Sequence, residues 1–500
     1  MISGQAGILA AIVIYLLAMV YVGFYFSKKG SGDSADDFYL GGRKLGPFVT
    51  AMSAEASDMS SWLLMGLPGV AYLTGIADAG WTAIGLGIGT YLNWLIVAQR
   101  LRRYSIVCNA ITIPDFFSRR FKDDKNILMC ISAIIILVFF IPYTASGFKA
   151  IGTLFSSLFG TDYHIAMIVG AVVIVGYTVM GGFMAVSTTD LIQSVVMSIS
   201  LVVIVFYGIH MAGGWSEVVN NATSLAGYLS ITQLHDRATA SAAPYGLLSI
   251  VSTVAWGLGY FGMPHILLRF MAIEEEKKLV LSRRIATVWV LISMCVAILI
   301  GIIGYGASVA GSIPMFTTSS QSETVIIQFA HLLGQNGFLL SLVAGVVLAG
   351  ILACTMSTAD SQLLTAASGV SQNLLQDFLK IKMSTAASMN AAVFLAWNPD
   401  SSVFTIVSFA WAGFGASFGP LVLFALFWRR TNMQGALAGM LTGGVMVFVW
   451  KYLVRPLGGN FNIYELLPAF VLSCLAIVIV SLLTKEPSKE IYDEFDSVGK

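Results

Sequence analysis

The sequence predicts an all-α polytopic membrane protein with about thirteen transmembrane helices. Three observations support this fold class: 57% of the 500 residues are hydrophobic, only 11% are charged, and apolar runs recur along the whole chain. A soluble domain carries roughly 25% charged residues, whereas about 20 consecutive apolar residues span a bilayer core of ~30 Å. The composition therefore excludes a string of soluble domains.

The first apolar run, 7–26, has no basic segment before it and no small-residue cleavage site after it. We expect a retained span rather than a signal peptide. Charged or Gly/Pro-rich breaks separate it from further candidate spans at 47–76, 79–98, 127–155, 163–181, 187–211, 244–271, 285–310, 337–365, 384–397, 401–428, 436–454 and 463–484.

The tenth of these spans is short. Its 15 residues from Met383 to Trp397 form a helix of about 22 Å, less than the ~30 Å core. We expect either a helix that extends back to residue 379 or residues missing from the chain. An abnormal Cα separation between 380 and 390 would reveal the second case.

Lysine and arginine gather on the loops of one side, which identifies that side as cytoplasmic. With the N-terminus outside, the inside segments hold Lys28, Lys29, Arg43, Lys44, Arg100, Arg102, Arg103, Arg119, Arg120, Lys122, Lys125, Lys277, Lys278, Arg283, Arg284, Lys380, Lys382, Arg429, Arg430, Lys485, Lys489 and Lys500. The outside segments hold only Arg237, Lys451 and Arg455. We therefore expect a multi-pass cell-membrane protein with an external N-terminus and a cytoplasmic C-terminus. Lys149 and Arg269, near span ends, are expected to snorkel.

Three spans contain stretches that weaken a helix. In the second span, Ser53–Ser61 holds Glu55 and Asp58, although a bare carboxylate at mid-bilayer costs ~2.5 kcal/mol or more. The seventh span carries WGLGYFGMP (256–264), and the eleventh carries WAGFGASFGP (411–420). Broken backbone at this depth is tolerated only where it is buried in protein or lines a wet cavity.

The second and seventh spans are five apart, so they cross the membrane in opposite directions. This arrangement predicts an inverted repeat of two five-helix halves, with one extra helix before and two after. The expected organisation is 1–46 (external end, first span and inside loop), 47–211 (first repeat), 212–243 (external loop), 244–428 (second repeat), 429–484 (two C-terminal spans) and 485–500 (cytoplasmic tail, expected to be mobile).

Two further stretches allow alternative interpretations. GLGYFG, Gly257–Gly262, matches G-x-G-x-x-G, but no predicted strand precedes it, which favours a helix break or close helix packing over a dinucleotide site. The ninth span contains ILACTMSTADSQLL (351–364), whose hydroxyls either bond back to their own helix or face an ion. An unwound second span could supply carbonyl oxygens that surround one ion together with the hydroxyls of Ser357 and Thr358. That pairing favours a sodium-binding cage.

Several classes of protein find no support in the sequence. The net charge of +1, without a basic stripe, gives no sign of a nucleic-acid partner. The five cysteines and five histidines show no metal-type spacing and supply no nucleophile and base for an enzyme. A channel would need a continuous polar path, whereas these breaks are short and isolated. A transporter without enzymatic activity remains.

Four stretches resemble the sodium:solute symporter family, especially its proline-transporting members. They are DDFYLGGRKLGPFVTAMSAEASDMSSWLLMGLPG (36–69), AWGLGYFGMPHILLRFMA (255–272), MSTADSQLL (356–364) and FAWAGFGASFGP (409–420). The resemblance, from about residue 7 to 484, implies the inverted-repeat fold of sodium-coupled amino-acid transporters. It further implies a secondary active transporter, functional as a monomer in the lipid bilayer, that imports L-proline by sodium symport through alternating access. A sodium symporter of another small solute, such as another amino acid or a monocarboxylate, is the alternative.

Carried over position by position, the resemblance implies two adjacent sites and a gate. The implied sodium site comprises the carbonyls of Ala56, Met59 and Cys354 and the hydroxyls of Ser357 and Thr358, with Asp58 as a ligand or a long-range attractor. The implied proline site comprises Ser60, Trp62, Tyr143, Trp256, Tyr260 and Pro264. Arg43 is assigned to an inner gate. Glu55 and Cys354 depart from the family pattern, and Glu55 is a candidate second cation or proton site.

Overall fold

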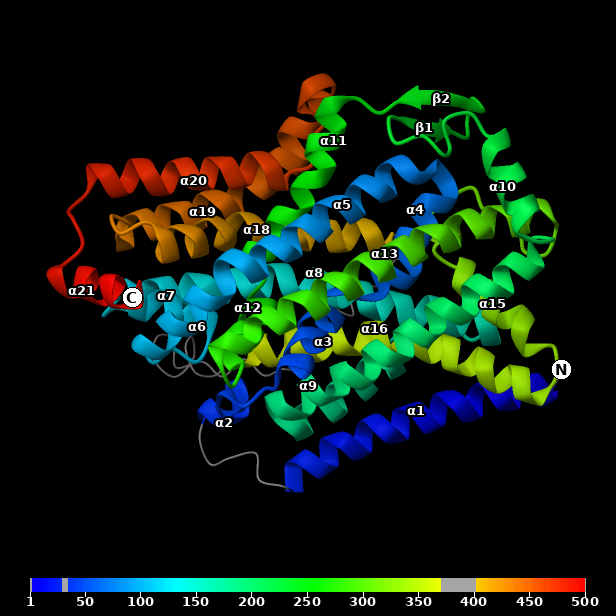
Figure 1. Ribbon diagram of the computed structural model, residues 1–500, viewed down its shortest axis with the longest axis horizontal. Coiled ribbons are helices and arrows are strands. Elements are labelled where there is room, and N and C mark those ends of the chain that lie inside the picture. Colours follow the sequence, from blue (N-terminus) through cyan, green and yellow to red (C-terminus); the bar gives the residue numbers. More distant parts are fainter. Residues whose placement is uncertain (1, 29–34, 370–401, 500) are drawn as a thin grey trace.

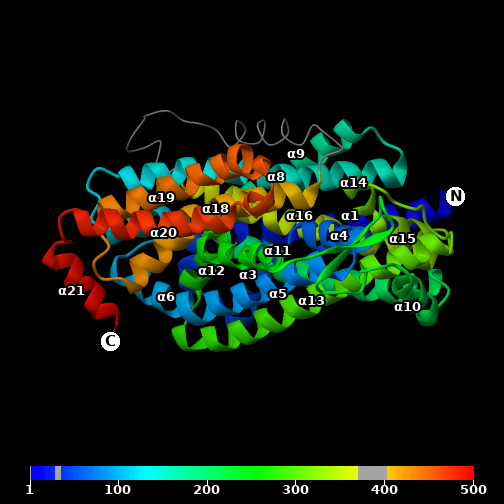
Figure 2. The same ribbon diagram turned by 90° about the horizontal axis from the view of Figure 1, so that it is seen from above.

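The computed structural model describes residues 2–28, 35–369 and 402–499, and it is almost entirely helical. The long helices run mainly along the longest axis of the molecule, as Figures 1 and 2 show. Within these ranges, nine helices are long and apolar enough to cross a membrane, or ten if one bent pair counts as a single span. The all-α membrane fold is confirmed, and the count of thirteen stays a prediction.

The elements of the first half, in chain order, are α1 (Ile2–Lys28), α2 (Ala35–Leu40), η1 (Gly41–Arg43), α3 (Pro47–Asp58), η2 (Trp62–Gly66), α4 (Leu67–Thr74), α5 (Ile76–Leu92), η3 (Asn93–Val97), α6 (Ala98–Val107), α7 (Ile113–Arg120), α8 (Ile127–Phe159), α9 (Tyr163–Met211) and α10 (Trp215–Ser224). An antiparallel hairpin of β1 (Gln233–Asp236) and β2 (Ser241–Pro244) follows, with Gln233 opposite Pro244.

The second half continues with α11 (Leu247–Val254), η4 (Ala255–Gly262), α12 (Pro264–Ala272), η5 (Glu276–Lys278), α13 (Leu279–Val309), α14 (Ser319–Ser322), α15 (Val325–Gly334), α16 (Phe338–Gly369), α18 (Val403–Phe427), α19 (Met433–Val449), η7 (Trp450–Val454), η8 (Arg455–Leu457), η9 (Gly459–Phe461), α20 (Leu466–Leu483) and α21 (Lys489–Val498). The predicted tenth span and the Cα separation between 380 and 390 lie outside the described residues.

The predicted break in the second span is confirmed. Helix α3 ends at Asp58, and Met59 leaves the helical region with φ −75° and ψ 67°. The Met59 N–H still bonds the Glu55 carbonyl, but the Ser60 N–H turns back to the Asp58 carbonyl. A wider π-type turn, η2, then restarts the helix. The break therefore releases the Ala56 carbonyl from the backbone partner that a continuous helix would supply.

The seventh span is also broken as predicted. The 3₁₀ segment η4 replaces α-helix over Ala255–Gly262, and the chain bends by 48° at Met263 before Pro264 opens α12. Glycines in η4 permit close packing, because a Cβ on Gly259 would lie 1.7 Å from Nε1 of Trp411. The G-x-G-x-x-G stretch is therefore a packing segment.

The prediction of a broken eleventh span is wrong. Helix α18 is continuous from Val403 to Phe427 and includes Pro420. Its glycines admit neighbouring side chains instead: a Cβ on Gly413 would lie 2.1 Å from the Phe139 ring, and one on Gly419 would lie 2.8 Å from the Phe470 ring. Small residues in membrane helices allow such close approach without unwinding the backbone.

Helix α9 contains both the fifth and the sixth predicted spans. Gly182 interrupts it with φ 61° and ψ −171°, a conformation that residues with a Cβ rarely adopt. The two predicted spans are thus two helical segments joined at this glycine.

The C-terminal tail is ordered as α21, so the expectation of a mobile tail is wrong. Ile491, Phe495 and Val498 recur at helical spacing and are buried. Lys122 pairs with Glu490 and Glu494, which directly precede two of these buried residues. The amphipathic pattern of this short helix explains why it packs against the protein.

Candidate functional site

Helices α3 and α16 bring together four of the six residues of the predicted sodium site, which are Ala56, Cys354, Ser357 and Thr358. The Ser357 hydroxyl donates to the Ala56 carbonyl at 2.8 Å and lies 3.2 Å from the Cys354 carbonyl. The Thr358 hydroxyl donates to the same Cys354 carbonyl at 3.2 Å, a bond back to its own helix α16, as the first of the two interpretations of this span expected. All four residues are buried. No hydrogen bond among the described residues joins Met59, at the adjacent break, to this oxygen cluster.

The oxygen cluster suits a small hard cation. Its members are two carbonyls and two hydroxyls, and oxygen is the ligand that such cations prefer. The C-terminal end of the half-helix α3 carries partial negative charge, which adds to the attraction. Cys354 contributes only its carbonyl to the cluster, so its thiol does not disturb the set of oxygens.

Asp58 connects the oxygen cluster to the aromatic residues. Its backbone carbonyl accepts from the Tyr143 hydroxyl at 3.1 Å and the Trp62 indole at 3.3 Å. Its side-chain carboxylate accepts from the Tyr260 hydroxyl on η4. The carboxylate therefore points toward the broken seventh span, on the side of the predicted substrate residues.

The predicted substrate residues gather around the two breaks. Trp62 and Trp256 lie with ring centroids 6.0 Å apart, and both are buried. The Trp411 indole donates to the Trp256 carbonyl at 2.9 Å and meets the Tyr260 ring edge-on at 5.2 Å. Trp411 was absent from the predicted site, although it stands in the quoted WAGFGASFGP stretch.

The two remaining predicted substrate residues lie at the breaks themselves. Ser60 is buried between α3 and η2, and Pro264 is buried at the first turn of α12. The six predicted substrate residues are all buried, so this region is closed to water in the structure.

Glu55 is held by the neighbouring span rather than by the oxygen cluster. Its Oε1 accepts from the Thr90 hydroxyl and from the Trp94 indole, each at 3.0 Å. Thr90 and Trp94 are four residues apart, so they lie on one face of the α5–η3 helix. These bonds anchor α3 to that helix.

Lys149 and Glu323 form a buried ion pair of 3.1 Å, so the expectation that Lys149 snorkels is wrong. Glu323 also accepts from the Ser402 hydroxyl at 2.8 Å and from the Val403 N–H at 3.2 Å. The pair therefore joins α8 to the start of α18. Burial of the ammonium is tolerated because a carboxylate lies beside it.

Arg269 does not snorkel either, because it is fully buried between four helices. Its guanidinium pairs with Asp190 at 3.1 Å and reaches the hydroxyls of Ser53 at 3.0 Å and Ser361 at 2.6 Å. Sequence reasoning missed Asp190, although it is the lone acidic residue of the sixth predicted span.

Arg43 joins three segments on the predicted cytoplasmic side. It donates to the Ser105 hydroxyl and to the carbonyls of Met271 and Ala110 at 2.9, 2.9 and 2.7 Å. Next to it, the Leu45 N–H bonds the Ala272 carbonyl at 3.1 Å. These contacts fasten the loop before α3 to the ends of α6 and α12.

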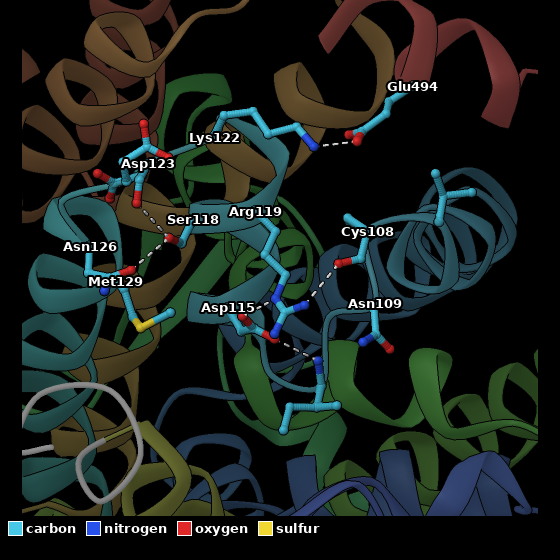
Figure 3. Close-up of a pocket in the computed structure, with 13 residues that line it drawn as sticks. Cys108, Asn109, Asp115, Ser118, Arg119, Lys122, Asp123, Asn126, Met129 and Glu494 are labelled. Carbon is cyan, nitrogen blue, oxygen red and sulfur yellow. Dashed lines mark hydrogen bonds and ion pairs between the residues drawn. The ribbon is translucent and has the colours of Figure 1, made fainter. Parts of the chain in front are cut away.

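A polar pocket of about 620 Å³ lies apart from these sites, between α6, α7, α8 and α21. Figure 3 shows Arg119 directed at Asp115 and the Cys108 carbonyl, and Lys122 directed at Glu494. Burial raises the pKa of the Cys108 thiol to about 12, so this thiol stays protonated. The pocket contains none of the predicted site residues.

The chain is similar to known proteins over nearly its full length. The model of the sodium:solute symporter family matches residues 38–443. A sodium/proline symporter of Haemophilus influenzae is 41% identical, over 98% of this chain and 97% of that protein. The osmoregulated proline transporter OpuE of Bacillus subtilis is 40% identical, over 99% of this chain and 98% of that protein.

Two solved structures share the fold. A Na⁺-coupled sialic acid symporter in a substrate-bound outward-open state superposes with a TM-score of 0.73, at 18% identity over 97% of this chain and 99% of that chain. A nucleobase-cation-symport-1 family transporter in a closed conformation gives 0.53, at 13% identity over 92% of this chain and 98% of that chain. At these identities the likeness concerns the fold alone.

Proposed function

The chain belongs to the sodium:solute symporter family, and on this premise we propose that it imports L-proline together with sodium. Two relatives at about 40% identity are named for proline transport, and their similarity covers nearly the whole chain. The observation that carries the proposal is the break in the second span: α3, which carries Ala56, ends at Asp58, and Asp58 accepts hydrogen bonds from Tyr143 and Tyr260.

In this proposal sodium binds at the oxygens of Ala56, Cys354, Ser357 and Thr358. The carbonyl of Met59 completes the set when the break adjusts around the ion. Each hydroxyl turns its hydrogen away from its present carbonyl partner and presents a lone pair to the cation. Asp58 attracts the ion through its charge and holds the tyrosines of the substrate site in place.

Proline binds on the other side of Asp58, between the broken spans. Aromatic faces of Trp62, Trp256 and Tyr260 pack the pyrrolidine ring and attract its ammonium. The backbone N–H groups at the start of η2 and α12 receive the carboxylate. Sodium and proline thus share one flexible backbone segment, so each tightens the binding of the other by the same factor.

Alternating access follows from clusters on the two sides of the site. The pair of Lys149 and Glu323 closes the predicted outer side, and Arg43 closes the predicted inner side. A sodium ion that enters the cell moves down the inside-negative membrane potential. This potential contributes roughly 2.3 kcal/mol per charge at 100 mV. That free energy, with the sodium gradient, drives accumulation of proline.

The test is uptake of labelled proline into proteoliposomes with and without an inward sodium gradient. We expect uptake only with sodium, and competition by unlabelled proline but not by other amino acids or monocarboxylates. Asp58→Asn should abolish sodium-driven uptake and leave the protein folded. Uptake that ignores the sodium gradient, or stronger competition by another solute, would contradict the proposal.

A further inference from the structure

An apolar groove of about 650 Å³ runs along the outer face of the bundle between α9 and α13. The groove is lined on one side by Val195, Ile199 and Val202 and on the other by Val288 and Ile292. The lining also includes Phe48, which is exposed, and Met52, which is buried, both on α3. These five side chains of α9 and α13 are about half exposed, so the groove opens where the bilayer surrounds the helices.

A single cation marks one end of this groove. Arg284 belongs to its lining, is exposed, and makes no ion pair or hydrogen bond with another described residue. The neighbouring Lys278, by contrast, is neutralised by Glu274 and Glu275. Arg284 follows the predicted cytoplasmic loop, so it lies at the level of the inner lipid headgroups.

The length of the groove matches one leaflet. From Arg284 to Val296 the lining of α13 rises by 12 residue steps, about 18 Å of helix, and half of a bilayer core is ~15 Å. An acyl chain can therefore lie along the groove while its headgroup reaches Arg284.

We propose that this groove is a binding site for an anionic phospholipid. The phosphate group pairs with the Arg284 guanidinium, and one acyl chain packs on the apolar side chains between α9 and α13. Basic side chains at grooves between transmembrane helices select anionic headgroups by charge, while the exposed apolar walls favour a hydrocarbon chain over water.

The site has a direct route to the transport machinery. Phe48 and Met52 lie on α3, the half-helix that ends at Asp58 and carries Ala56. A bound acyl chain contacts that half-helix from the lipid side and stabilises its position between α9 and α13. The proposed lipid therefore stabilises the arrangement of α3 seen in this structure, in which the predicted substrate residues are closed to water. Removal of the lipid is expected to alter the rate of transport.

The first experiment measures lipid retention, which does not depend on the transported solute. Native mass spectrometry compares the purified protein with Arg284→Gln, using phosphatidylglycerol and phosphatidylethanolamine as probes. We expect wild type to retain phosphatidylglycerol preferentially and Arg284→Gln to bind it about five-fold more weakly, the effect of one cation near a membrane surface. The control is Lys277→Gln, a neighbouring exposed cation outside the groove.

The second experiment fills the groove. Val288→Trp should reduce both phosphatidylglycerol retention and the dependence of uptake on that lipid in proteoliposomes. Val445→Trp is the matched control, because Val445 is 57% exposed on α19 and Val288 is 56% exposed. Equal lipid retention by wild type and Arg284→Gln, or equal loss in Arg284→Gln and Lys277→Gln, would overturn the proposal.

Discussion

Removal of one hydroxyl from the oxygen cluster is the sharpest test of the sodium site. Ser357→Ala deletes the group that lies 2.8 Å from the Ala56 carbonyl and 3.2 Å from the Cys354 carbonyl. Without it, α3 and α16 lose this hydrogen bond, and a bound sodium ion loses one oxygen ligand. We therefore expect the sodium concentration for half-maximal uptake to rise.

The magnitude follows from the charge of the ion. A hydrogen bond or ligand contact to a charged group contributes about 1.5–3 kcal/mol, which corresponds to a rise of about ten- to a hundred-fold. Thr358→Ala should have an effect of the same size, since its hydroxyl contacts the same Cys354 carbonyl. The double variant should fall short of the sum, because both hydroxyls serve one ion.

Thr355→Ala is the matched control. Thr355 is equally buried on the same helix, but its hydroxyl bonds the Ile351 carbonyl at 3.0 Å, and neither group belongs to the oxygen cluster. The assay is the sodium dependence of uptake into proteoliposomes, with sodium-dependent thermal stabilisation as a second readout. A similar shift in Thr355→Ala, or no shift in Ser357→Ala, would refute this assignment of the sodium ligands.

Three further predictions concern packing and closure. Glu323→Ala should destabilise the protein by ~3–5 kcal/mol, because it leaves the buried Lys149 ammonium without its partner. Lys149→Met should destabilise it less, and the unfolding temperatures of the two variants test this order. Gly259→Ala should raise the half-saturating proline concentration and lower the unfolding temperature, because its Cβ would lie 1.7 Å from the Trp411 indole nitrogen. The control is Gly246→Ala, which has open space around the added Cβ and should behave as wild type. Arg43→Lys should keep proline binding but slow uptake several-fold, since an ammonium cannot reproduce the forked bonds of the guanidinium; equal losses in binding and uptake would argue against a gating role.

Local sequence patterns correctly predicted the breaks in the second and seventh spans. The break in the second span falls within the polar stretch Ser53–Ser61, and the bend in the seventh falls at Met263, directly before Pro264. Proline alone does not decide the outcome, because α18 stays helical through Pro420. The eleventh span shows the limit of such patterns: its glycines resemble those of the seventh, but α18 stays helical whereas the seventh span forms the 3₁₀ segment η4. A glycine permits both outcomes, and only packing selects between them.

The sequence by itself determined the membrane class, the order of the spans and the breaks near Asp58 and Met263, because hydrophobic length and helix-breaking residues act locally. Only the tertiary structure decided that Ser357 meets Ala56, that Lys149 and Arg269 are buried rather than at the interface, and that Trp411 and Asp190 join the sites. Those contacts connect residues far apart in the chain. They depend on how helices pack, and packing is a property of the assembled bundle rather than of any one segment.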